Sequence, residues 1–66
     1  MRYLLTVLKA DENEAIDVLY LGRDYLKMRD AVNLAHSNVE LRGKRICMLR
    51  STDDGEVVER RVFPLY

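Results

Sequence analysis

The sequence predicts an α+β fold: a four-stranded antiparallel sheet with one helix packed on one face, in the order β-β-α-β-β. Four short apolar runs have the length and composition of strands, and one stretch between the second and the third run has helical spacing. The three glycines and the single proline lie at the ends of these runs, where turns are expected. Because 66 residues are enough for one compact unit, residues 1–66 are expected to form a single domain.

The first hairpin is predicted from two apolar runs, residues 2–9 and 15–21, joined by a short polar loop. Placing Val7 opposite Val18 gives a β-branched cross-strand pair on the core face. The same register brings apolar side chains to the opposite face as well, and four of them are leucines: Leu4, Leu8, Leu19 and Leu21. It also places Leu5 opposite the aromatic ring of Tyr20 on the core face.

A single helix is predicted over residues 25–37. Asp24 is the expected N-cap, because its side chain can accept hydrogen bonds from the first free backbone N–H groups. Asn38 is expected to end the helix, since Asn tolerates the left-handed conformation of a C-cap. One arc of about 180° collects the side chains expected to face the sheet: Tyr25, Met28, Ala31, Val32, Leu34 and Ala35. Leu26 falls outside this arc and is expected to point toward water.

The second hairpin is predicted from residues 44–50 and 57–65, with a type I turn that needs Gly55 in the left-handed conformation. An uninterrupted ladder behind this turn gives the pairs Ile46 with Val62, Met48 with Arg60, and Arg50 with Val58. Ile46 and Met48 then face the helix, and Leu49 and Phe63 lie on the face away from it.

The outward apolar face is predicted to be an interaction surface. Its residues are Leu4, Leu8, Leu19, Leu21, Leu49 and Phe63. Contiguous apolar patches mark sites of association, here with a second copy of the chain or with another protein. The small size of the chain favours association, so a homodimer is expected. Two plainer explanations stay open: single apolar residues are normal on surfaces, and a register slipped by one residue would exchange the two faces.

The formal net charge is zero, but residues 22–50 hold seven bases and three acids. A nucleic-acid contact through this segment and the following strand would use Arg42, Lys44, Arg45, Arg50, Arg60 and Arg61. The zero total argues against generic phosphate binding, and the aromatic residues are not interleaved with the bases. The alternative is that these charges keep a loop and a strand edge soluble.

Four acidic residues surround the first predicted turn: Asp11, Glu12, Glu14 and Asp17. Their spacing does not match a calcium-binding loop, and a solvated hairpin turn explains them. If the turn has a further role, it is a negative docking tip that orients a partner together with the basic segment 42–50.

The sequence contains no arrangement typical of an enzyme, so a non-enzymatic protein without a cofactor is expected. It has no glycine-rich phosphate loop, no nucleophile elbow and no metal-ligand spacing. Cys47 and His36 are the only cysteine and histidine, which excludes an internal disulfide and a zinc site of the usual spacing. Cys47 is expected to be a small packing residue.

The sequence also predicts a cytoplasmic protein without a membrane partner. No apolar run approaches the roughly 20 residues of a membrane span. The N-terminus begins like a signal peptide, but Thr6, Lys9 and Asp11 interrupt its apolar core. The single thiol agrees with a reducing compartment.

Taken together, these observations predict a small protein-binding module that docks on a larger protein through the outer sheet face. Free-standing domains of this size and balanced charge are common among phage and mobile-element proteins that inhibit host machinery, an analogy of size and style rather than of motif. Two other functions stay open: a small nucleic-acid-binding regulator that uses the basic segment, and a self-associating structural protein.

Overall fold

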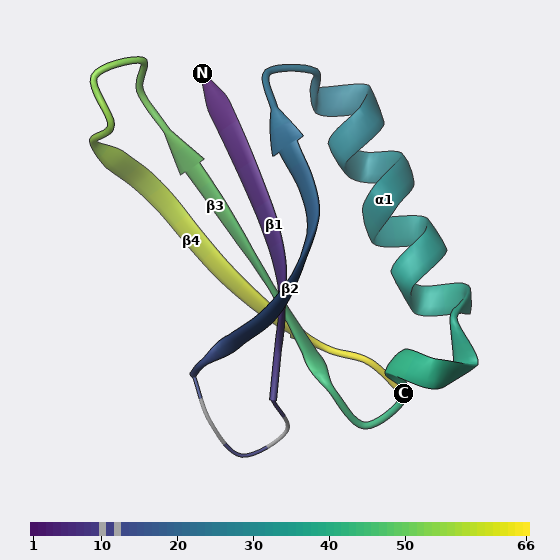
Figure 1. Ribbon diagram of the computed structural model, residues 1–66. Coiled ribbons are helices and arrows are strands. Elements are labelled where there is room, and N and C mark those ends of the chain that lie inside the picture. The colour runs from purple at the N-terminus through teal and green to yellow at the C-terminus, as the bar shows by residue number, and fades with distance from the viewer. Residues whose placement is uncertain (10, 12) are drawn as a thin grey trace.

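The structure is a computed structural model that describes residues 1–9, 11 and 13–66. Its elements, drawn in Figure 1, are β1 (Arg2–Leu8), β2 (Ala15–Gly22), α1 (Tyr25–Ser37), the 3-10 turn η1 (Val39–Leu41), β3 (Arg45–Ser51) and β4 (Val57–Pro64). The four strands form one antiparallel sheet in the order β2-β1-β3-β4, so β1 and β3 are central and β2 and β4 are its edges. The predicted α+β fold and element order are confirmed.

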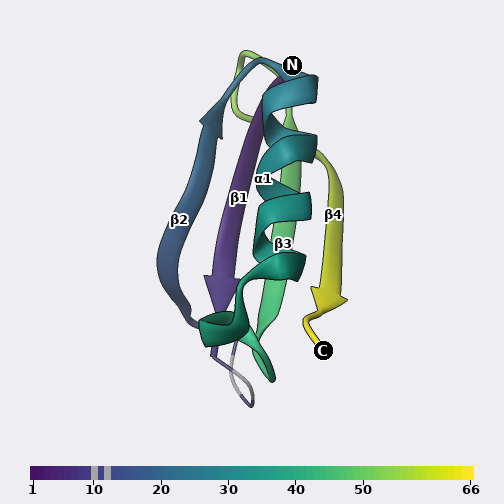
Figure 2. The ribbon, with the colours of Figure 1, turned by 90° about the vertical axis from the view of Figure 1, so that its right-hand side faces the viewer.

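The core lies between the central strands and α1, which covers one face of the sheet (Figure 2). Leu5 and Val7 of β1 and Ile46 of β3 are fully buried, at 0% exposed. They belong to one cluster of buried side chains, Leu5, Val7, Met28, Ala35, Ile46, Met48 and Leu65. Since β1 and β3 are each paired on both sides, their helix-facing side chains have neighbours in every direction.

Side-chain caps define both ends of α1. The Asp24 carboxylate accepts from the backbone N–H groups of Leu26 at 2.9 Å and Lys27 at 3.3 Å, as predicted. Asn38 ends the helix, but its backbone is extended (φ −87°, ψ 111°), so the predicted left-handed conformation is wrong. The reason is that Asn38 also begins η1, where its side chain accepts from the backbone N–H of Glu40 at 3.0 Å.

Two leucines of α1 remain exposed. Leu26 is 57% exposed, as predicted from its place outside the apolar arc. Leu34 is 71% exposed, although it was expected to face the sheet. It lies at the margin of the arc, beside Leu19 and Ala31 at the β2 edge of the sheet, where no further strand covers it.

The first hairpin contains two bulges, both in β2. The first leaves Leu19 as an extra residue between the pairs Leu5–Tyr20 and Thr6–Val18. The Leu5–Tyr20 pair is confirmed, but the predicted Val7–Val18 pair is wrong, because the bulge shifts the register by one residue. Leu19 packs against the helix-side core, so its predicted place on the outer face is wrong as well.

The second hairpin also contains a bulge, which reverses the faces of β4. Its turn forms as predicted, with Gly55 at φ +90° and the backbone N–H of Thr52 donating to the carbonyl of Glu56 at 2.8 Å. Beyond the turn, Val58 is an extra residue in β4. The observed pairs are therefore Ile46–Phe63, Met48–Arg61 and Arg50–Glu59, one residue away from the predicted ones. Phe63 lies on the helix side of the sheet, so its predicted place on the outer face is wrong.

Candidate functional site

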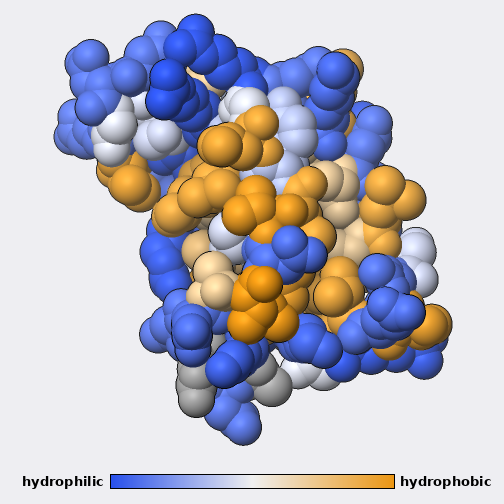
Figure 3. Space-filling view, in the orientation of Figure 1, coloured by the Kyte–Doolittle hydropathy of each residue, from blue (hydrophilic) through white to orange (hydrophobic). Residues whose placement is uncertain are grey.

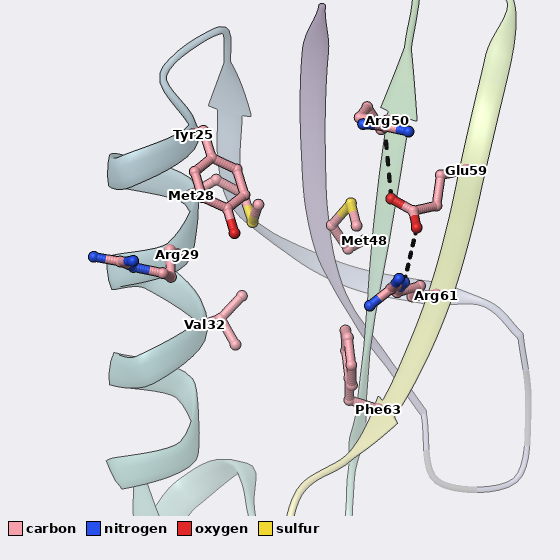
Figure 4. A pocket seen from close by; sticks show the side chains of 9 residues that line it. All are labelled: Tyr25, Met28, Arg29, Val32, Met48, Arg50, Glu59, Arg61 and Phe63. Carbon is pink, nitrogen blue, oxygen red and sulfur yellow. Dashed lines mark hydrogen bonds and ion pairs between the residues drawn. The ribbon is translucent and has the colours of Figure 1, made fainter.

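A groove of about 410 Å³ lies between α1 and the strands β3 and β4. It exists because α1 packs chiefly against β1 and β2. The sheet diverges from the helix toward β4, which Figure 1 shows at the side of the sheet farthest from α1. Toward β4 the helix-facing side of the sheet is therefore only partly covered. Side chains from both walls border the space between, and the guanidinium of Arg29 is directed away from it (Figure 4).

Regular spacing places the residues of each wall. The helix wall consists of Tyr25, Met28, Arg29 and Val32, which form one stripe because residues three, four and seven apart share a face of a helix. The strand wall consists of Met48, Arg50, Glu59, Arg61 and Phe63. The last three are two residues apart and share one face of β4. The bulge at Val58 turns this set toward the groove, so an uninterrupted ladder could not have predicted it.

The strand wall carries a small ion-pair network. The Glu59 carboxylate lies 2.8 Å from Nε of Arg61 and 3.7 Å from Nε of Arg50, so one acid holds two guanidinium groups. The Glu59 side chain is 28% exposed, less than either arginine, so it forms the inner member of the network. These pairs are partly solvated and contribute at most about 1 kcal/mol each to stability. Their main effect is to orient the two arginines along the groove.

The helix wall adds a third guanidinium without a counter-charge. Arg29 is exposed and forms no ion pair with any residue that the structure describes. With three arginines and one glutamate, the lining has a formal charge of +2. Beneath the charges, Met28 and Met48 are buried, and Val32 and Phe63 pack against the core. The groove is thus an apolar trough with an excess of positive charge at its margins.

The ionisable side chains of the lining are the phenol of Tyr25, the carboxylate of Glu59 and the three guanidinium groups. Within the described part of the chain, no group of three or more acidic, histidine or cysteine side chains is arranged to hold a metal ion. Nor is any helix among the described residues long and apolar enough to cross a membrane.

The predicted interface on the outer sheet face forms only in part. Leu21, Leu4 and Leu49 lie in one row across three strands, with Leu4 opposite both of the others. Leu4 and Leu49 are half-buried and Leu21 is 70% exposed. Leu8 is only 3% exposed, and it shares this face with the buried residues Thr6 and Cys47. Leu8 is therefore already covered within the single chain, and the accessible outer apolar surface is smaller than predicted.

The edge strand β2 exposes a second apolar surface. Ile16, Val18 and Leu21 are 44%, 56% and 70% exposed. Figure 3 shows apolar atoms gathered across the middle of this side of the molecule, with polar residues around them. Asp17 is the one charged residue of β2. However, the two bulges interrupt the strand, and such irregularity weakens pairing with a strand of another chain.

The predicted basic residues do not form one surface. Arg50 and Arg61 line the groove, whereas Arg60 lies opposite Leu49 on the other face of the sheet. Lys44 donates through Nζ to the carbonyl of Glu40 at 3.2 Å. Arg45 donates through Nη2 to the carbonyl of Lys9 at 3.1 Å, and Arg42 is exposed in the loop before β3.

The predicted acidic turn is described in part, since Glu12 lies outside the described residues. Glu14 forms an ion pair with Lys9 at 3.5 Å, with both side chains more than half exposed. The Asp17 carboxylate accepts from the backbone N–H of Val18 at 2.8 Å. Asp11 is exposed. These contacts fit a solvated turn, remote from the groove.

Comparison with protein-family models, curated proteins and solved structures finds no match to this chain.

Proposed function

We propose, from the geometry of the chain alone, that it is a small protein-binding module and that the groove between α1 and β3–β4 is its main docking site. Protein interfaces are enriched in Tyr, Phe, Met and Arg and depleted in Lys. Seven of the nine lining residues belong to these four enriched types, and none is lysine. Concave apolar pockets with charged margins are also where the dominant contacts of an interface sit. This composition is the observation that carries the proposal.

The module would act by covering a surface of a larger protein. The apolar floor would bury side chains of the partner, and the arginines at the margins would set its orientation. Methionine suits such a floor, because its flexible thioether side chain adapts to irregular shapes. If the covered surface includes the active site or a binding site of the partner, the chain would inhibit the partner by steric occlusion.

A pair of valine variants tests the docking site. Val32 lies in the groove and Val62 on the outer face of the sheet, and both are half-buried. The tagged wild-type chain, Val32→Lys and Val62→Lys would each be used for affinity capture from a native lysate treated with nuclease. Thermal unfolding would first establish that both variants fold.

The proposal predicts one stoichiometric protein that the wild type and Val62→Lys retain and Val32→Lys loses. A partner retained by Val32→Lys but lost by Val62→Lys would place the site on the outer face and refute the groove. Capture of nothing beyond the chain itself would contradict protein binding.

Self-association through the β2 side is a second candidate, supported by the exposed side chains of Ile16, Val18 and Leu21. Val18 and Val57 provide a matched pair, since they lie on opposite edge strands and are 56% and 54% exposed. If two copies associate through β2, sedimentation velocity should show a dimer that Val18→Lys dissociates and Val57→Lys does not. A monomer at every concentration would remove this candidate.

Nucleic-acid binding has less support, because the basic residues are divided between two faces of the sheet. Phosphate binding would weaken steeply as salt is raised, whereas an interface centred on apolar contacts would not. A second capture from an untreated lysate makes the same distinction. Proteins captured only when nuclease is omitted would favour the nucleic-acid-binding regulator over docking in the groove.

A further inference from the structure

We infer that the groove between α1 and β3–β4 accepts an amphipathic helix of another protein whose apolar face is flanked by acidic side chains. This inference rests on the proposed function and adds the shape and charge of the partner segment. Three features lead to it: the length of the groove, the charge of its margins and the character of the neighbouring edge strand.

The length of the groove matches two turns of a helix. From Tyr25 to Val32, the helix wall extends by seven residues, or about 10 Å. From Glu59 to Phe63, the strand wall extends by four residues, or about 13 Å. Figure 4 shows that the two walls run side by side, with Tyr25 toward the Arg50–Glu59 end and Val32 toward Phe63. A partner helix with apolar residues at i, i+4 and i+7 would place its anchors over about the same 10 Å.

The charges of the groove select an acidic partner. Arg61 stands on the strand wall beside the groove. The Arg29 guanidinium lies at the outer margin of the helix wall and points away from the strands (Figure 4), so its exposed side chain would turn toward a carboxylate on the adjacent flank of a bound helix. Arg61 already has one carboxylate at 2.8 Å, whereas Arg29 has none among the described residues. Arg29 is therefore the guanidinium group of the lining that can pair with an incoming acid without giving up an existing ion pair. Guanidinium–carboxylate pairs are charge-assisted and directional, which favours a defined orientation.

A bound strand fits this groove less well than a helix. Strand addition requires a free, regular edge, and here that edge is β4. This strand contains the bulge at Val58 and ends at Pro64, which has no N–H to donate. Between them, Glu59, Arg60 and Arg61 place three consecutive charges on the edge. These features disfavour backbone pairing between β4 and a partner strand. A partner would therefore contact the side chains of the groove instead.

A second copy of this chain does not supply the required segment. Its one long helix, α1, contains a single acidic residue, Asp30, beside the bases Lys27 and Arg29. The apolar stripe of that helix is also engaged with its own sheet through Met28 and Ala35. The partner is therefore expected to be a different protein.

Defined peptides test this inference without knowledge of the partner. The probe is a capped amphipathic peptide about four turns long, with leucines at i, i+4 and i+7 and glutamates on both flanks. One control peptide has lysines in place of the glutamates, and another has the same composition with prolines that prevent a helix. Binding to the full chain would be followed by NMR through the backbone amides of Arg29, Val32, Met48 and Arg61.

Charge-reversal variants of α1 complete the experiment. Arg29→Glu changes a groove residue, and Lys27→Glu makes the same charge change on the same helix outside the groove lining. The glutamate peptide should bind the wild type with a dissociation constant of roughly 0.1–1 mM and shift the groove amides. The lysine peptide should bind on the order of tenfold more weakly. Arg29→Glu, which changes the formal charge of the lining from +2 to 0, should abolish this preference, and Lys27→Glu should not.

Three results with the peptides would overturn the inference, and one result in sedimentation would reassign the groove. Equal binding of the glutamate and lysine peptides would refute the acidic partner, and equal binding of the proline peptide would refute the helix. Absence of groove shifts with every peptide at millimolar concentration would refute both. In each case a lysate partner that Val32→Lys loses and Val62→Lys retains would leave the proposed protein-binding function standing. A dimer in sedimentation that Val32→Lys dissociates would instead assign the groove to a second copy.

Discussion

The two isoleucines of this chain provide a matched test of the sheet and its bulges. Ile46 in β3 is fully buried, whereas Ile16 in β2 is 44% exposed and is the extra residue of the second bulge. Ile46→Val removes one buried methylene group and leaves a cavity, so it should cost about 1 kcal/mol of unfolding free energy. Ile16→Val removes the same group from a half-hydrated position at an edge, where the loss should be about 0.4 kcal/mol.

The corresponding alanine variants enlarge the difference. Ile46→Ala should cost about 2–5 kcal/mol, out of a total of about 3–10 kcal/mol for a chain of this length. It is therefore expected to leave the chain marginally folded or unfolded. Ile16→Ala should keep most of the stability, because its site can fill with water without leaving a buried cavity.

Urea unfolding followed by far-UV circular dichroism measures these differences as midpoint shifts at constant slope. Each kcal/mol should also lower the melting temperature by about 4–8 °C. Equal losses for Ile46→Val and Ile16→Val would refute the burial assigned to the two strands. A changed slope in either variant would show that the denatured state had changed, and the comparison would then use the melting temperatures alone.

Three further predictions concern the caps, the second turn and the thiol. Asp24→Ala should lower the unfolding free energy by about 1 kcal/mol, because it removes the acceptor at the start of α1. Asp30→Ala, in the middle of the helix, should change it little, and equal effects in thermal unfolding would contradict the cap. Gly55→Ala should cost about 1–2 kcal/mol, since Gly55 has φ +90°. Gly55→Asn should cost less in the same assay, and if both variants were neutral the left-handed turn would be wrong. Cys47, 4% exposed, should react with an aromatic disulfide reagent at least about 100-fold more slowly in the folded chain than in urea. Equally fast labelling in both states would show that the outer sheet face is open.

The elements of this fold could be predicted from the sequence because their signals are local. Asp24 caps the helix from its own first turn, and Gly55 alone allows the left-handed turn of the second hairpin. Strand runs and helical spacing are likewise contained in short windows, and all six boundaries of the first two strands and the helix fall within one residue of expectation. The inward orientation of Ile46 and Met48 followed from strand alternation and is confirmed.

The candidate site depended on the bulges, for which the sequence carries no clear signal. Val58 in β4 and Leu19 in β2 are extra residues in runs whose two faces have a similar content of apolar residues. Shifting such a run by one residue exchanges two similar faces, so the pattern does not penalise the wrong register. The expected register therefore puts Phe63 and Leu19 on the outer face and does not bring Glu59 and Arg61 to the groove, which they line in the structure.

By itself, the sequence determined the number and order of the strands and the place of α1 among them, because those depend on side chains that are neighbours along the chain. Only the tertiary structure decided the register of β4, the divergence of the sheet from α1 and hence the groove. Those features depend on contacts between residues far apart in the chain, such as Met48 with Arg61 and α1 with β1 and β2. They are set by how the whole core packs, and a local pattern whose two faces have a similar apolar content leaves that choice open.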